Sequence, residues 1–269
     1  MTRLSAPDSQ TTKEACENAF MVVLHDFAPP FSEQLCEICS QLKPLVGSNF
    51  SAGFVPCWHG GNAASGDTLA PLLLGCKEVV IHGLSHQRIA GGGILSWVCN
   101  RSDEFRGLPA AVVTERLQQA RKLTVEQLGE AKVKHVVGVL PPAYQFPETK
   151  TFFCDQRNDD YLYVLRFSRI DFRGGMSVPI NTWSYDWGRF SSAGWAGKVS
   201  ADSQSLIRLA IPCLAIHPID LQRGWFRDAI RLIRKWLSEG RQPVTPSDLL
   251  LKSHQSSELL LPEGCSPAE

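Results

Sequence analysis

Short apolar runs that each end in a cluster of polar, metal-capable or proline-rich residues constrain the fold of this chain more than any other feature. The runs are residues 19–24, 79–81, 136–140 and 211–216, and their lengths are typical of buried strands. They are followed by His25-Asp26, His82-Gly83-Leu84-Ser85-His86, Pro141-Pro142-Ala143-Tyr144 and His217-Pro218. Parallel strands end on one side of their sheet, so clusters that are far apart in sequence can converge there. This pattern predicts an active site on the carboxyl-terminal face of an α/β barrel.

Composition limits the classes of protein that the chain can belong to. Its 269 residues suffice for one barrel domain or two small domains, and 43% of them are hydrophobic, as in a globular protein with a full core. The chain has 27 basic and 27 acidic residues, so its formal net charge is zero. We therefore expect no bulk basic surface for nucleic acid or for an anionic membrane.

The two ends differ in character from the middle. Residues 1–17 are expected to form a flexible arm, residues 252–269 a polar, disordered tail, and residues 18–251 the folded domain. The first residues are polar and acidic, unlike a signal peptide, and no apolar stretch approaches the ~20 residues of a membrane span. We therefore expect a cytoplasmic protein whose nine cysteines are reduced. Cys36 and Cys39 form a CxxC inside a predicted helix, without the second pair that a four-thiolate zinc site requires, so we expect them to be structural.

Strands and helices are predicted to alternate along the chain. We expect strands at 20–24, 49–56, 77–81, 135–140, 161–167 and 211–216. We expect helices at 32–46, 68–74, 111–130 and 225–239, an insertion at 94–105, and loop with short strands at 174–187. This order favours a parallel sheet with crossover helices.

His82 and His86 are four residues apart at the end of a predicted strand. In a helical turn that spacing puts both imidazoles on one side. A carboxylate from another strand, most obviously Asp26, would complete a site of two histidines and one acid. Three protein ligands leave a coordination position open, which is typical of a catalytic metal. A divalent metal there would polarise a carbonyl and activate water.

Taken together, the clusters resemble the polysaccharide deacetylase superfamily and, within it, a divergent branch known as DUF2334. The first motif of the family, an Asp just after the first strand, matches the segment 23–29 with Asp26. The branch motif His-Gly-x-Ser/Thr-His matches residues 82–86, and its Glu-Phe pair matches Glu104-Phe105. The proline-aromatic turn matches residues 141–144, and the final His-Pro matches His217-Pro218. The resemblance covers about residues 19–250 and implies a single-domain, distorted (β/α) barrel with seven strands.

The resemblance also implies a chemistry. Zinc would bind to Asp26, His82 and His86, and water would attack an N-acyl group, most simply N-acetyl, on an amino sugar or a sugar-containing molecule. His217 would be the general acid, and the metal with a backbone N–H near Tyr144 would hold the oxyanion. The cytoplasmic expectation favours a small molecule or a glycoconjugate precursor as the substrate.

The chain departs from the family at the general base. His25 stands where typical members have the first of two adjacent aspartates, and Leu140 stands where an Arg helps to hold that base. His25, with an ordinary pKa near ~6.5, and Glu104 are the two candidates for the base. His25 could equally orient the substrate, and a barrel that binds carbohydrate without catalysis fits the same departure. A deacylase of non-sugar amides is a third interpretation.

Four residues are candidates for substrate contact: His59, Pro142, Tyr144 and Trp183. His59 follows a predicted strand, and Pro142 and Tyr144 belong to the turn that lines the groove in the family. Trp183 alternates with Tyr185 and Trp187, a pattern that suits either a sugar-stacking surface or a core. The oligomeric state is left open by the sequence.

Overall fold

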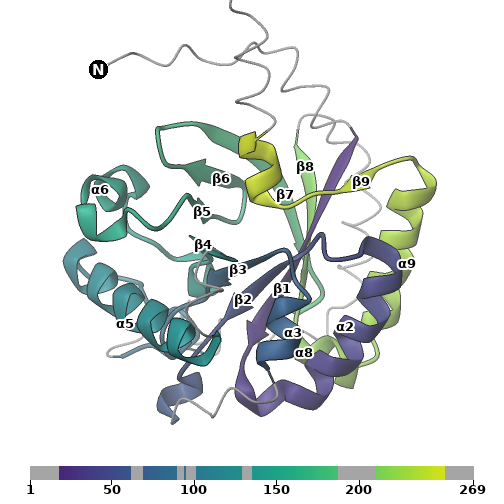
Figure 1. Ribbon diagram of the computed structural model, residues 1–269, viewed down its shortest axis with the longest axis horizontal. Helices are drawn as coiled ribbons and strands as arrows, with labels where there is room; N and C mark the ends of the chain where they lie inside the picture. The colour runs from purple at the N-terminus through teal and green to yellow at the C-terminus, as the bar shows by residue number, and fades with distance from the viewer. Residues whose placement is uncertain are drawn as a thin grey trace, which may run out of the picture.

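The computed structural model describes residues 18–61, 69–89, 94, 101–128, 135–186 and 210–251. The predicted arm and tail, at 1–17 and 252–269, and Trp187 lie outside these residues. The strands of the described part are β1 (Ala19–Phe27), β2 (Ser51–Phe54), β3 (Glu78–Ile81), β4 (Val136–Val139), β5 (Tyr163–Leu165), β6 (Arg169–Phe172), β7 (Ser177–Ser184), β8 (Ile211–Ile216) and β9 (Gln242–Pro243). All of them belong to one sheet (Figure 1).

The sheet closes into a barrel. Its order is β2-β3-β4-β5-β6-β7-β8-β1-β9, and β2 also pairs with β1, so the strands from β1 to β8 form a closed ring. The predicted (β/α) barrel is thus confirmed, but with eight strands in the ring instead of the expected seven. The short β9 pairs with the start of β1, outside the ring.

Two of the pairings correct the expectation of a parallel sheet. β6 pairs antiparallel with both β5 and β7, whereas the other pairs are parallel. Exposed and buried residues alternate along β6 and the first half of β7. This is the pattern of antiparallel strands that face water on one side. The sequence predicted loop with short strands at 174–187, where β7 lies, and predicted no element at the position of β6.

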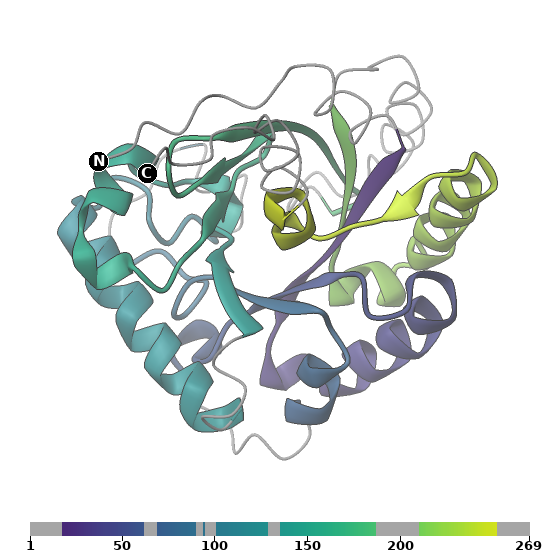
Figure 2. The ribbon, with the colours of Figure 1, turned by 45° about the horizontal axis from the view of Figure 1, so that its top comes forward.

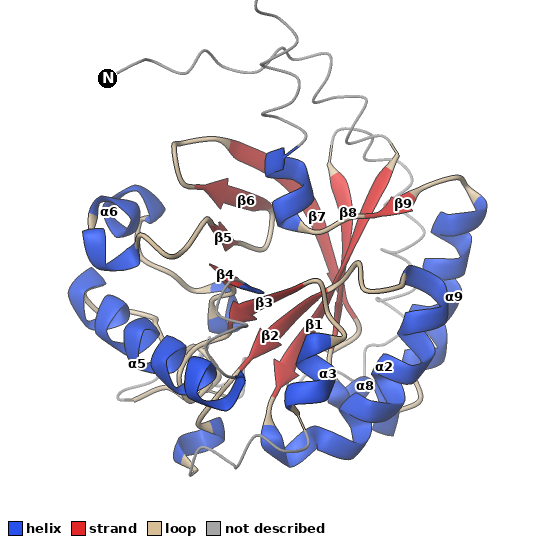
Figure 3. Ribbon diagram, viewed as in Figure 1, coloured by secondary structure: helices blue, strands red, loops and turns tan. Residues whose placement is uncertain are grey.

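The helices surround the barrel, as Figure 3 shows in blue around the red strands. They are α2 (Ser32–Val46), α3 (Ala70–Leu74), α5 (Ala110–Leu128), α6 (Thr149–Cys154), α8 (Pro218–Gln222) and α9 (Phe226–Ser238). Helix α2 has the predicted bounds, because its buried residues Leu35, Ile38, Leu42 and Val46 recur at helical spacing. Gly47, with φ of 63°, ends it. No helix in the described ranges is both long enough and apolar enough to cross a bilayer.

The core has two layers, which the pleat of β1 separates. Phe20, Val22 and Leu24 belong to the layer between the barrel and the helices, and Met21 and Val23 to the layer inside the barrel. The segment that contains β9 contributes Val244 and Leu249 to the inner layer. Figure 2 shows this last segment, in yellow, crossing the barrel. The barrel interior is therefore filled by side chains.

The polar clusters come together at one end of this barrel. β1, β2, β3 and β4 are parallel neighbours, and β8 is parallel to β1 on its other side. Asp26, His82, Pro141 and His217 stand at or directly after the carboxyl ends of β1, β3, β4 and β8. The site is built on this shared edge.

Candidate functional site

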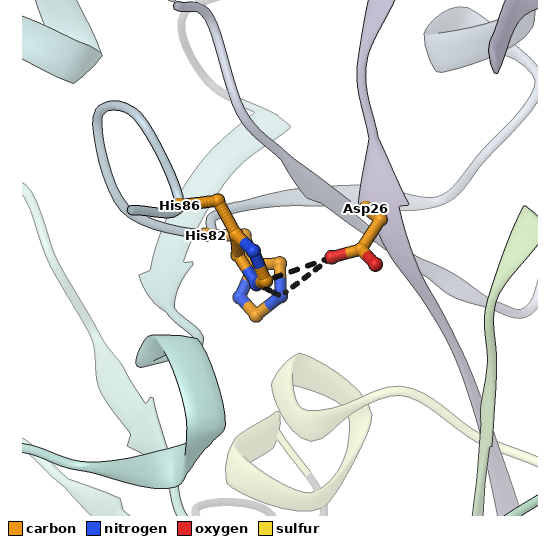
Figure 4. A group of neighbouring side chains, drawn as sticks. All are labelled: Asp26, His82 and His86. Atoms are coloured by element: carbon orange, nitrogen blue, oxygen red, sulfur yellow. Dashed lines mark hydrogen bonds and ion pairs between the residues drawn. The ribbon is translucent and has the colours of Figure 1, made fainter. Parts of the chain in front are cut away.

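Three ligand atoms converge at the carboxyl edge. Asp26 Oδ1 lies 3.3 Å from His82 Nε2 and 3.2 Å from His86 Nε2, and the two nitrogens are 3.0 Å apart (Figure 4). Ligands at ~2.1 Å from one metal ion, with angles of ~90–110° between them, are themselves ~3.0–3.4 Å apart. Among the described residues, this is the one group of three or more His, Cys, Asp or Glu whose ligand atoms gather so closely.

The donor set fits a divalent cation. His82 Nδ1 lies 2.8 Å from the carbonyl oxygen of Leu140, which can only accept, so Nδ1 carries the proton and the Nε2 lone pair faces the site. Asp26 Oδ1 is buried and has no hydrogen-bond partner in the described part of the chain. An electron-rich cluster of this kind is costly without a positive charge at its centre. Both imidazoles are buried, whereas the Asp26 side chain keeps 16% of its surface exposed, so the site has one open side.

The charges of the site suit metal binding. Burial, partly opposed by Asp26, lowers the pKa of His86 to about 3. Burial and the neighbouring His217 and His82 hold the pKa of His25 well below its ordinary value. Burial opposes ionisation of Asp26, but the neighbouring His86, His217 and His82 together outweigh it and keep the pKa of that carboxyl well below its usual range. At neutral pH Asp26 is therefore a carboxylate and the His86 imidazole is neutral, the forms in which these side chains coordinate metals.

Unusual backbone conformations concentrate at this site. Asp26, His59, His86, Ala143 and Tyr144 have φ between 48° and 56°, and they are five of the six non-glycine residues with positive φ in the described ranges. Side chains disfavour this region of φ/ψ space, and such strain clusters at functional sites. These positive φ values do not depend on which side chains could bind a metal, and they identify the same functional site.

A bulge in β1 helps to aim Asp26. The register of β1 against β2 shifts between Leu24 and Phe27, which brackets His25 and Asp26. A bulge re-aims side chains where a regular strand would alternate them between its two faces. Both residues can therefore contribute to one site, although they are adjacent in sequence.

Glu104 does not face the ligand atoms. Its carboxylate accepts hydrogen bonds from the backbone N–H of Leu84 (3.1 Å), Ser85 (3.0 Å) and His86 (2.7 Å), and from Arg116 Nε (2.8 Å). Both of its oxygens are thus committed to the loop between the two histidines and to a guanidinium. These four bonds occupy the lone pairs of both oxygens, so they favour a role for Glu104 other than that of general base.

His25 lies between the predicted metal site and two other polar residues. Its ring centroid is 4.9 Å from that of His82 and 4.7 Å from that of His217. Its Nε2 lies 3.1 Å from the Tyr144 hydroxyl. Burial raises the pKa of Tyr144 well above its ordinary value, so the phenol stays protonated and able to donate to His25. Tyr144, expected at the substrate, therefore bonds to the residue in the position of the base.

His217 begins helix α8 and is held there by Asp220. The Asp220 carboxylate accepts from His217 N at 2.8 Å, and the same oxygen lies 3.9 Å from His217 Nδ1. Ser184 Oγ lies 3.4 Å from Nδ1 and donates its own hydrogen to the Asp186 carbonyl, so it can only accept from the imidazole. Burial raises the pKa of Asp220 to about 6. Two acceptors near Nδ1 favour a proton on that nitrogen.

An aromatic stack lies beside the predicted ligands. The rings of His59 and Trp58 are stacked at 4.6 Å and 15°, and Trp58 stacks on His86 at 5.1 Å and 14°. His59 is exposed at the outer end of this stack. His59 was predicted from the sequence to contact substrate, whereas Trp58 was not. The signal for Trp58 was its place directly before His59, after a buried strand.

The other two substrate candidates occupy different environments. Pro142 is buried against Gly83, where a Cβ atom would come within 2.7 Å of the proline ring and 2.5 Å of Glu104. Trp183 is 4% exposed and belongs to the core layer between the barrel and the helices. This burial favours the core role over the sugar-stacking role that the sequence left open for Trp183.

Comparisons with known proteins bear on the fold. No protein-family model matches the sequence, and no curated protein matches it. Among solved structures, the fold is similar to the crystal structure of the Xyl-CE4 domain of a multidomain xylanase from the hindgut metagenome of Trinervitermes trinervoides. The TM-score is 0.52 and the identity 13%, over 88% of this chain and 92% of that domain. At this identity the comparison shows a shared fold and nothing finer.

Proposed function

We propose that this chain is a metal-dependent hydrolase that removes an N-acyl group, most simply N-acetyl, from an amino sugar or a sugar-containing molecule. The observation that carries the proposal is the convergence of Asp26, His82 and His86 at the carboxyl edge of the barrel. The likeness of the fold to a Xyl-CE4 domain supports it. The resemblance of the sequence clusters to motifs of the polysaccharide deacetylase superfamily and its DUF2334 branch supports it as well. Zinc suits two imidazoles and a carboxylate best.

A divalent ion held by these three residues supplies Lewis-acid chemistry, because it polarises an acyl carbonyl and makes water acidic enough to attack near neutral pH. The protein's own contribution begins with geometry. His82 is oriented by Leu140, and the open side at Asp26 leaves room for an acyl group to approach. The buried surroundings exclude competing water and strengthen each electrostatic contact.

Proton transfer falls to the two remaining histidines. His25 is neutral at neutral pH and lies beside the ligands, so we assign it the role of general base. In this role its Nε2–H donates to the Tyr144 hydroxyl oxygen, and the lone pair of Nδ1 is free to take the proton. His217 carries the proton for the departing nitrogen. The Asp220 carboxylate, 3.9 Å from His217 Nδ1, orients the imidazole for this transfer.

The substrate side of the proposal rests on the open edge of the site. His59 is exposed at the end of the ring stack, and Tyr144, in the turn Pro142–Tyr144 after β4, is half-buried, so we propose these two residues for substrate contact. We propose a soluble intermediate or a glycoconjugate precursor as the substrate. The net charge of zero gives no reason to expect nucleic acid as a partner.

Metal analysis tests the proposal. The protein, purified without chelators, should hold about one equivalent of zinc or of another first-row divalent metal per chain. Asp26→Ala should lose most of it, whereas Asp159→Ala should keep it, because Asp159 is 68% exposed and pairs with Arg173 away from the site. A wild-type chain without zinc, nickel, cobalt or iron would refute the proposal, and so would Asp26→Ala with a full complement.

Turnover separates the hydrolase from a barrel that only binds. His25 in place of an aspartate is the observation that favours the binding alternative. Release of acetate from N-acetylated amino sugars, measured on the metal-loaded wild type and on His217→Gln, should show turnover that the variant loses. Retained metal with no release from any N-acyl or O-acyl sugar, or from acylated amines, would favour the binding protein.

A further inference from the structure

We propose that Glu104, backed by Arg116, is the positioning residue of the loop that carries His82 and His86, and that this pair sets the metal affinity of the site. The inference rests on the proposed metal site and assigns Glu104 a role that differs from the base the sequence suggested. Its basis is that both the backbone N–H groups and the backbone carbonyls of this loop are hydrogen-bonded.

On one side, three successive N–H groups of the loop converge on a single carboxylate. Leu84, Ser85 and His86 donate to Glu104 at 3.1, 3.0 and 2.7 Å. Consecutive backbone N–H groups in a turn form a concave site for an anion, and here the anion is a side chain of the same protein. The shortest of the three bonds comes from His86, a predicted metal ligand.

On the other side, the carbonyls of the same loop are also bonded. Leu84 O accepts from Cys57 N at 3.0 Å, and Ser85 O accepts from His59 N at 2.8 Å. The loop is thus hydrogen-bonded to Glu104 on one side and to the turn at residues 57–59 on the other. A loop with both its donors and its acceptors bonded is held rigidly before any ligand binds.

The two histidines are oriented in different ways, and this difference gives Glu104 its importance. His82 has a partner at Nδ1, the Leu140 carbonyl, which fixes its ring. His86 Nδ1 is buried with no hydrogen-bond partner in the described ranges. A metal-binding histidine usually depends on such a partner. The ring of His86 instead depends on its backbone, which Glu104 holds at φ of 54°, and on the stacked Trp58.

Arg116 stabilises the buried carboxylate of Glu104. Glu104 is 1% exposed, and a buried carboxylate needs both a counter-charge and hydrogen bonds. Arg116 on helix α5 lies 2.8 Å from Glu104 and also donates to Ser85 Oγ at 3.1 Å. The helix therefore neutralises the charge and contacts the loop directly. Gly83 completes the arrangement, because a Cβ there would lie 2.5 Å from Glu104 Oε2.

The test compares Glu104→Gln with a matched control, Asp103→Asn. Asp103 is also 1% exposed and is ion-paired, but with Arg88 at 2.7 Å and Arg106 at 3.7 Å. Zinc is titrated into each metal-free protein against a competing chelator. We expect the affinity of Glu104→Gln to fall about 10- to 100-fold, the usual effect of losing a partner that orients metal ligands. Asp103→Asn should bind zinc like the wild type.

Two further readouts distinguish positioning from general stability. The cobalt-loaded Glu104→Gln protein should show a shifted visible absorption spectrum, because the ligand geometry changes. Without metal, the amide protons of residues 84–86 should exchange faster in this variant than in the wild type, as measured by NMR. A purely structural role would lower the unfolding temperature and leave the cobalt spectrum of the folded protein unchanged.

The outcomes separate this inference from the proposed function. Wild-type protein that binds no zinc would refute the proposed function, and unchanged amide exchange in Glu104→Gln would then overturn the positioning role as well. Wild-type protein that binds zinc, together with a Glu104→Gln variant of equal affinity, would overturn the inference alone. If Glu104→Gln does not fold, the titration is read on Arg116→Lys, where an undiminished affinity would likewise overturn it.

Discussion

The raised pKa of Asp220, which contacts the proposed general acid His217, can be tested by measuring how stability depends on pH. Its carboxylate is fully buried, and only the backbone N–H of His217 donates to Oδ2, whereas Oδ1 has no hydrogen-bond partner in the described part of the chain. Burial raises its pKa from 3.8 to about 6. The protonated form is thus favoured in the folded state. The stability that this proton contributes is present below the ordinary pKa and is lost as the pH rises through about 6.

The size of the effect follows from the shift. A difference of about 2 pKa units corresponds to about 3 kcal/mol of unfolding free energy between about pH 4 and about pH 7. Asp220→Asn removes the carboxyl group that titrates. The unfolding free energy of the variant should therefore not decrease in this way as the pH rises. The new amide N–H₂ would lack an acceptor at the former Oδ1 position and cost about 1–3 kcal/mol. That cost does not vary with pH, so the variant should be less stable than the wild type in acid and close to it, or more stable, near neutrality.

Urea unfolding at a series of pH values, in the presence of a chelator, measures both proteins. The quantity of interest is the stability of Asp220→Asn minus that of the wild type, which should rise by about 3 kcal/mol over the range. Asp159→Asn, at a carboxylate that is 68% exposed, controls for the substitution itself. A difference that stays flat with pH, or that falls, would refute the reasoning.

Two other substitutions test the barrel and the site. Gly138→Ala would put a Cβ 2.5 Å from the ring of Tyr163, whose hydroxyl bonds to the buried Glu78 carboxylate at 2.6 Å. Overpacking and the strained bond should together cost about 3–5 kcal/mol in urea unfolding, and a loss below about 1 kcal/mol would contradict the packing argument. Tyr144→Phe removes the bond to His25 and should cost about 1 kcal/mol. Zinc titration should find its affinity unchanged, because the hydroxyl bonds to none of the ligand atoms, and about a tenfold loss would contradict this placement.

The elements that the sequence predicted well are those with a strong local pattern. Helix α2 and strand β8 have the expected bounds, because a stripe of apolar residues at helical spacing and an uninterrupted apolar run each allow one interpretation. Strands β6 and β7 were missed as regular strands. They flank Gly174 and Gly175 and alternate polar with apolar residues, and their partners are determined by pairing across the barrel. A short, half-exposed strand has little local signal, so its formation depends on its neighbours.

For the candidate site too, the local sequence predicted some features and the tertiary structure decided others. The sequence by itself determined which strand ends carry Asp26, His82, His86 and His217, because short apolar runs mark strands, and parallel strands share one edge. Only the tertiary structure decided the number of strands in the ring and the direction of individual side chains: Glu104 holds a backbone loop, and Trp183 packs in the core. The physical reason is that residue type and spacing are local properties of the chain. The partner that a buried carboxylate or ring meets is set by segments that arrive from elsewhere in the sequence.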